Sequence, residues 1–146
     1  MTATDGSRTI ITNLSTNIYL NGLQGSDLIE AKELRWGEAL LGGEQIEWNN
    51  SRNIDLIIGA DIIYDNSAIP ALVATMVDLN NLFPNIKILI ASTIRNETTF
   101  ATFMEACRKN IFVVENIDFD VLPPEKQEGP FYGDGTPIRL YIIRKP

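Results

Sequence analysis

The chain has 146 residues, of which 45% are hydrophobic and 21% charged, and its formal net charge at pH 7 is −7. This length indicates one domain, residues 1–146, that can bury a core without disulfides. The acidic balance disfavours nucleic acid as a partner. The absence of histidine excludes a Ser-His-Asp triad and a histidine-ligated metal, and the single cysteine, Cys107, excludes an internal disulfide. No metal site is predicted.

The sequence also lacks the features of a membrane or secreted protein. No stretch approaches the roughly 18 apolar residues of a membrane span, and the polar first residues do not have the pattern of a signal peptide. The lone Cys107 lies among apolar residues at helical spacing, which indicates a buried side chain without a chemical role. We therefore expect a protein of the reducing cytoplasm, with no membrane partner.

The first part of the chain predicts a strand end, a helix and a second strand. Residues 2–7 have the composition of a strand end and its turn, with an acidic residue, Asp5, where the strand finishes. Residues 8–20 place apolar side chains at helical spacing and are followed by Asn-Gly, a helix stop signal. Residues 26–34 are predicted to form a strand.

The central feature is the apolar run at residues 54–58, which is followed by the acidic Asp61 and the phenol of Tyr64. A strand that is apolar on successive residues is typical of a parallel α/β sheet covered on both faces. In such sheets, ligands bind beyond the carboxyl ends of the strands. The pattern therefore predicts chemistry at Asp61 and Tyr64, although a core strand followed by a polar turn explains it too.

The remaining elements continue the alternation of helices and strands. We predict helices at residues 67–82 and from a cap at Asn96 or Thr98 to Asn110, strands at 86–94, 111–122 and 137–144, and a Pro/Gly-rich loop at 123–136. The last strand follows a hairpin connection, so its neighbour should be antiparallel. Strands 54–58 and 86–90 should be adjacent and parallel, because a helix of crossover length separates them.

Several short motifs together resemble the family 16 group of seven-strand lysine methyltransferases. The motifs are residues 3–5, two asparagines on the first helix, residues 34–37 (Leu-Arg-Trp-Gly) and residues 59–64 (Gly-Ala-Asp-Ile-Ile-Tyr). Residues 92–100 are most similar to the fungal members near the elongation factor 2 lysine methyltransferases. The resemblance implies a Rossmann-like fold, S-adenosylmethionine as cofactor and a lysine of a protein substrate, possibly a translation factor, as methyl acceptor.

The resemblance also implies roles for five residues. Asp5 would bond the ribose hydroxyls of S-adenosylmethionine, Trp36 would pack on the adenine and Ala60 would line the cofactor pocket; Asp61 and Tyr64 would orient the substrate lysine. Each residue type suits its role, since a carboxylate accepts from a diol and an indole offers a flat apolar face. Structural alternatives are a helix cap for Asp5, core packing for Trp36 and simple packing for Ala60.

The chain departs from the family pattern before Asp5. The family has a first strand and a glycine-rich turn there, and that strand lies at the centre of the sheet beside the strand at 54–58. We interpret the chain as a C-terminal portion of a methyltransferase whose sheet lacks this strand, so that an apolar strand edge is left unpaired. Two alternatives remain open: a noncatalytic fragment or pseudoenzyme that acts as a protein-binding module, and half of a nucleotide-binding oxidoreductase.

Overall fold

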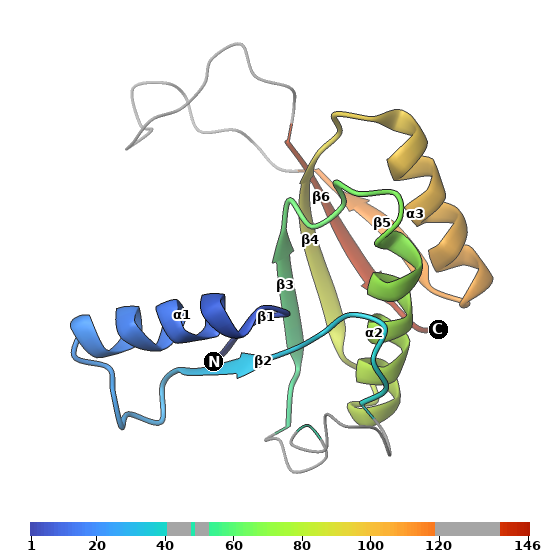
Figure 1. Cartoon of the computed structure of the whole chain (residues 1–146). Coiled ribbons are helices and arrows are strands. Elements are labelled where there is room, and N and C mark those ends of the chain that lie inside the picture. Colours follow the sequence, from blue (N-terminus) through green and yellow to red (C-terminus); the bar gives the residue numbers. More distant parts are fainter. Residues whose placement is uncertain (41–47, 49–52, 119–137) are drawn as a thin grey trace.

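The computed structural model describes residues 1–40, 48, 53–118 and 138–146, and Figure 1 shows the path of the chain. The described elements, in order, are β1 (Thr2–Asp5), α1 (Arg8–Leu20), β2 (Glu30–Glu33), β3 (Leu56–Ala60), α2 (Ile69–Leu82), β4 (Lys87–Thr93), α3 (Glu97–Lys109), β5 (Val113–Ile117) and β6 (Ile138–Arg144). The predicted order of helices and strands is confirmed. The central strand has the predicted length but lies two residues further along the chain than predicted, and the later predicted strands are longer than those observed.

The described strands belong to two sheets. The four-stranded sheet has the order β3-β4-β6-β5, with β3 parallel to β4 and β6 antiparallel to both of its neighbours. Strands β1 and β2 form a separate parallel pair, in which Asp5 lies opposite Glu33. The predicted parallel pairing of β3 with β4 and the antiparallel final strand are therefore confirmed, in a mixed α/β architecture.

Local sequence signals account for the ends of the helices. Helix α3 begins after Asn96, whose side-chain oxygen accepts the backbone N–H groups of Thr98 and Thr99 at 2.9 and 3.3 Å. Such a cap satisfies donors that have no partner inside the helix. Helix α2 carries a proline in its first turn, where the missing N–H costs nothing, and ends before Pro84.

The main core lies between helices α2 and α3 and one face of the four-stranded sheet. In Figure 1 both helices lie together beside this sheet, whereas α1 projects away from it. The buried side chains of this cluster are Ile63, Ile69, Leu72, Val73, Met76, Ile88, Ile90, Phe103, Cys107, Phe112, Tyr141 and Ile143. Cys107 is one of them, as predicted, and this burial raises the pKa of its thiol to about 12.

The opposite face of the four-stranded sheet is open. The side chains of Leu56 and Ile58 on β3 are 48% and 70% exposed, and Ile138 on β6 is 59% exposed. The prediction that β3 is covered on both faces is therefore wrong for this chain. The cause is the lack of a helix over this face within the described residues, since α2 and α3 both pack on the other one.

Strand β3 is also an edge strand. Within the described parts of the chain it bonds to β4 on one side and to no strand on the other, as predicted. The predicted loop at 123–136 and most of the loop before β3 lie outside the described residues. None of the described helices has the length and apolarity needed to cross a membrane.

Candidate functional site

Asp61 follows the last residue of β3 and connects the ends of β3 and β4. Its backbone N–H donates to the carbonyl oxygen of Ala91 at 2.9 Å. Its Oδ1 accepts the backbone N–H of Thr93 at 3.1 Å, and its Oδ2 accepts from Nη2 of Arg95 at 2.7 Å. These contacts fix the direction of the carboxylate at the carboxyl edge of the parallel pair.

The backbone at this position is strained. Asp61 has a φ of 53°, in the left-handed region that few residues other than glycine adopt. Two residues before it, a Cβ added to Gly59 would lie 2.5 Å from Cδ1 of Ile62, so a larger residue at 59 would require the Ile62 side chain to move. Strained backbone of this kind is concentrated at functional sites. Ala60, between the two, is exposed at the strand end.

Tyr64 and Asp65 continue from Asp61 towards helix α2. The side chain of Tyr64 is 70% exposed, so its hydroxyl is accessible at the surface. Asp65 stabilises the turn that leads into the helix, because its Oδ1 accepts both the N–H and the hydroxyl of Ser67 at 2.9 and 2.8 Å. These hydrogen bonds lower the pKa of the Asp65 carboxyl below its ordinary value.

Asp5 ends β1 in the two-stranded sheet. Its Oδ1 accepts the backbone N–H of Ser7 at 2.8 Å, and Ser7 is the residue that precedes α1. Its backbone oxygen accepts the N–H of Leu34 at 2.9 Å. Asp5 is thus not the cap of α1, because Ser7 holds that position, but one of its carboxylate oxygens stabilises the turn into the helix. A carboxylate oxygen has two lone pairs, so Asp5 keeps the capacity to accept from a diol.

Trp36 lies in the segment that leaves β2 and packs along helix α2. It is partly buried against the main core. The next residue, Gly37, has a φ of 83°, and its N–H donates to Oγ1 of Thr75 at 2.9 Å. Further along, the N–H of Leu40 donates to Oδ2 of Asp78 at 3.1 Å. Part of the indole therefore has the packing role that we kept as an alternative.

The structure brings some of the predicted residues together and separates others. Ala60, which ends β3, lies with Asp61 and Tyr64 of the following connection at the carboxyl edge of the four-stranded sheet, whereas Asp5 ends a strand of the other sheet. Sequence reasoning missed Arg95, which lies 34 residues from Asp61 and pairs with it. The only signal for it was its place directly after the second strand of a parallel pair, where side chains meet those of the first.

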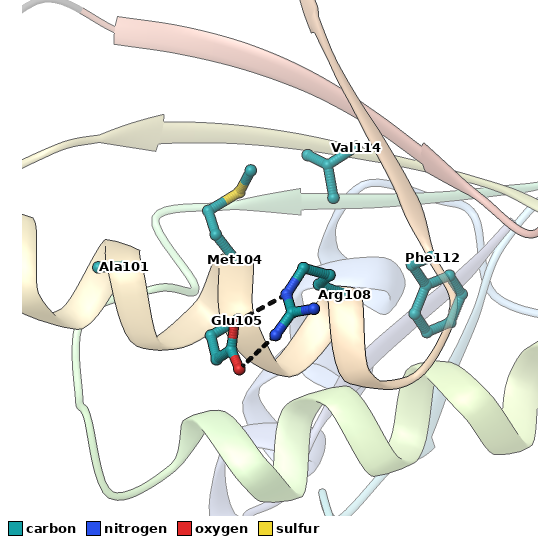
Figure 2. Close-up of a pocket in the computed structure, with 6 residues that line it drawn as sticks. All are labelled: Ala101, Met104, Glu105, Arg108, Phe112 and Val114. Atoms are coloured by element: carbon teal, nitrogen blue, oxygen red, sulfur yellow. Dashed lines mark hydrogen bonds and ion pairs between the residues drawn. The ribbon is translucent and has the colours of Figure 1, made fainter.

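A surface groove of about 420 Å³ lies elsewhere, between α3 and β5, at the opposite edge of the sheet from β3. Figure 2 shows Met104, Phe112 and Val114 around it and the ion pair of Glu105 with Arg108 beside them, with Nη2 of Arg108 2.8 Å from Oε1 of Glu105. Its two charged side chains neutralise each other, and none of the five predicted site residues lines it. We do not assign the candidate site to this groove.

Comparison with protein family models shows to which family the chain belongs. The lysine methyltransferase family model matches residues 1–110, three quarters of the chain and a range that includes all five predicted site residues. The chain belongs to the lysine methyltransferase family. The resemblance inferred from the short motifs is thereby confirmed.

Relatives with curated names are consistent with this family. Protein-lysine N-methyltransferase EFM3 of Chaetomium thermophilum is 49% identical over 143 residues, which cover 98% of this chain and 43% of the relative. EFM3 of Saccharomyces cerevisiae is 30% identical over 157 residues, which cover 99% and 42%. This member of the family therefore spans less than half the length of these two relatives.

Solved structures support the fold. A precorrin-6y C5,15-methyltransferase from Geobacter metallireducens aligns with a TM-score of 0.58 at 10% identity, covering 99% of this chain and 66% of that one. The delta-N METTL16 methyltransferase domain aligns with a TM-score of 0.55 at 11% identity, covering 99% and 61%. This family member thus has the Rossmann-like arrangement of methyltransferases, of which it contains a part.

Proposed function

We propose that this chain is the C-terminal portion of an S-adenosylmethionine-dependent protein-lysine N-methyltransferase. The observation that carries the proposal is the family match over residues 1–110, which contains the whole strained edge around Asp61. The relatives named protein-lysine N-methyltransferases support a protein substrate. From the resemblance to fungal members near the elongation factor 2 lysine methyltransferases we propose a translation factor as the substrate and the cytoplasm as the compartment.

The residues at the strand ends suit the cofactor by their chemistry. Asp5 offers a carboxylate for the ribose hydroxyls, Trp36 a flat indole for the adenine, and Ala60 a small exposed side chain at the end of β3. Bound there, S-adenosylmethionine supplies a methyl group on a positively charged sulfur. Because β1 and β3 belong to separate sheets, these contacts need the rest of the longer protein to form one pocket.

The proposed reaction needs little from the protein besides alignment of the nucleophile. The lone pair of a neutral lysine nitrogen forms the new N–C bond, the C–S bond breaks, its electron pair stays on the sulfur, and the extra proton on nitrogen leaves to water. Asp61 accepts a hydrogen bond from the amine and directs its lone pair, with Tyr64 beside it. Holding reactants in line in this way accounts for much of the rate of such transfers.

The test uses an enzyme in which this chain is completed by the part of the Chaetomium thermophilum relative that lies outside the alignment. We expect Asp61→Ala to abolish methyl transfer to elongation factor 2 while cofactor affinity, measured by isothermal titration, stays within about threefold, or about 0.7 kcal/mol. Asp5→Ala is the matched carboxylate variant. Its main effect should be on cofactor affinity, reduced about tenfold or more. Weak cofactor binding with residual turnover in Asp61→Ala would place this residue on the cofactor side.

One observation favours a second candidate, a noncatalytic protein-binding module. The edge of β3 is unpaired among the described residues, and Leu56 and Ile58 are exposed beside it. Such an edge can accept a strand from another chain. This alternative predicts a complex of defined size and no cofactor binding by the completed protein. The family match leaves the oxidoreductase alternative without support.

A further inference from the structure

The shortest hydrogen bond of the candidate catalytic carboxylate is with Arg95. Nη2 of Arg95 lies 2.7 Å from Oδ2 of Asp61, while Oδ1 accepts the backbone N–H of Thr93 at 3.1 Å. Both donors come from the end of β4 and the connection that follows it, next to the end of β3 in Figure 1. The carboxylate is thus held by two groups that precede helix α3.

This ion pair is exposed, so it contributes little to the stability of the fold. The side chains of Arg95 and Asp61 are 69% and 48% exposed, and exposed pairs are weakened by solvent screening and by the entropy of two ordered side chains. The backbone contact of Asp61 with Ala91 already joins the strand ends. A role in stability alone therefore explains the pair poorly, and its position at the proposed site suggests one in chemistry.

Methyl transfer makes opposing demands on a carboxylate near the lysine. A hydrogen-bond acceptor orients the amine, but an isolated negative charge stabilises the ammonium form, which has no lone pair for attack. A carboxylate paired with a guanidinium has no net charge and still has free lone pairs that accept from an amine. Pairing the carboxylate with an arginine thus lets the carboxylate orient the amine without a net negative charge that would stabilise the ammonium form.

The surrounding charges make this cation important. The connection after β3 carries Asp61, Tyr64 and Asp65, and the connection after β4 carries Arg95; both connections lie wholly within the described residues. Arg95 is the only cation in the two connections. Without it, Asp61 would lose the cation that lies 2.7 Å from its Oδ2.

We propose that Arg95 is a positioning residue: it keeps the Asp61 carboxylate oriented as an acceptor and cancels the charge that would otherwise hold the substrate lysine as an ammonium ion. This inference rests on the proposed function and adds to it a residue that controls the protonation state of the nucleophile. Arg95 acts through Asp61 and needs no contact with the reacting atoms.

The test is the pH dependence of kcat in the completed enzyme, with elongation factor 2 and radiolabelled S-adenosylmethionine. The rising limb of kcat reports ionisation in the enzyme–substrate complex. Arg95→Gln should move this limb upward by about one pH unit, giving about a tenfold loss at neutral pH that is recovered at high pH. Arg95→Lys, which keeps the charge, should restore most of the original profile.

Arg108→Gln is the matched control, because it removes another exposed arginine whose Nη2 lies 2.8 Å from a carboxylate oxygen on the side of α3. It should leave the pH profile unchanged. A loss in Arg95→Gln that is equal at every pH, or a profile that does not move, would overturn the role of Arg95 alone. No transfer by the parent enzyme would overturn the proposed function, and this inference with it.

Discussion

Helices α1 and α3 each have 13 residues, yet only α3 belongs to a core. Helix α3 buries Thr99, Phe103 and Cys107, whereas α1 has no buried residue although its apolar side chains recur at helical spacing. The difference lies in their partners: α3 packs against α2 and the four-stranded sheet, whereas the main contacts of α1 with the described elements are with the short pair β1–β2. Periodicity thus predicts where a helix forms, and the surrounding sheet determines how much that helix contributes to stability.

The largest effect is expected for two matched leucines, one on a core helix and one on α1. Leu72 on α2 is 4% exposed and belongs to the main core, whereas Leu14 on α1 is half-buried. We expect Leu72→Ala to lower the free energy of unfolding by about 2–5 kcal/mol, because it leaves a cavity, and Leu14→Ala to lower it by about 1 kcal/mol or less. Urea unfolding of both variants measures this. Equal losses would mean that α1 is packed as firmly as the core helices.

The thiol of Cys107, on the core helix α3, provides a second test of this comparison. Burial raises its pKa to about 12, so the folded state holds the neutral thiol. The stabilisation from this shift is complete below the unfolded pKa of about 8.5 and is lost as the pH rises towards the folded value. We expect the thiol to resist a disulfide reagent at pH 8 until urea unfolds the core, and unfolding to become easier from pH 9 upward.

The Cys107→Ser variant shows whether this thiol causes the alkaline loss, because a serine hydroxyl does not titrate in that range. The variant should be less stable at neutral pH, since it buries a hydroxyl among apolar groups, but it should lose less stability between pH 9 and pH 11. Rapid labelling of the native chain at pH 8 would contradict the burial of Cys107.

The smallest expected effect concerns the turn into α2. Hydrogen bonds from Ser67 lower the pKa of Asp65, so their contribution is present above the unfolded carboxyl pKa of about 3.9 and is lost as the pH falls through the folded value. Ser67→Ala should therefore lower the melting temperature slightly at pH 7, and this difference should shrink as the pH is lowered through the acid range. Ser15→Ala on α1, whose hydroxyl donates to a backbone oxygen, is the control. A pH-independent difference in Ser67→Ala would contradict this cause.

Local patterns predicted much of this fold and only part of the site. The limits of α1, the cap at Asn96 and the β3–β4 pairing follow from residues that are close in sequence or from a crossover rule. The exposed outer face of β3 could not be predicted, because a continuous apolar run indicates what a strand can bury and leaves open whether a helix covers it. The pairing of Asp61 with Arg95 joins residues 34 positions apart and depends on tertiary geometry.

The contact of Gly37 with helix α2 has a consequence for how this family can vary. A Cβ added at Gly37 would lie 3.0 Å from the Cβ of Ala71, and the φ of 83° already disfavours any side chain at position 37. Positions 37 and 71 therefore share one limited volume, although 34 residues separate them. A lineage that gains a side chain at 37 must move the helix or this segment and also hold an unfavourable φ, so position 37 is confined to glycine for as long as the backbone keeps this turn.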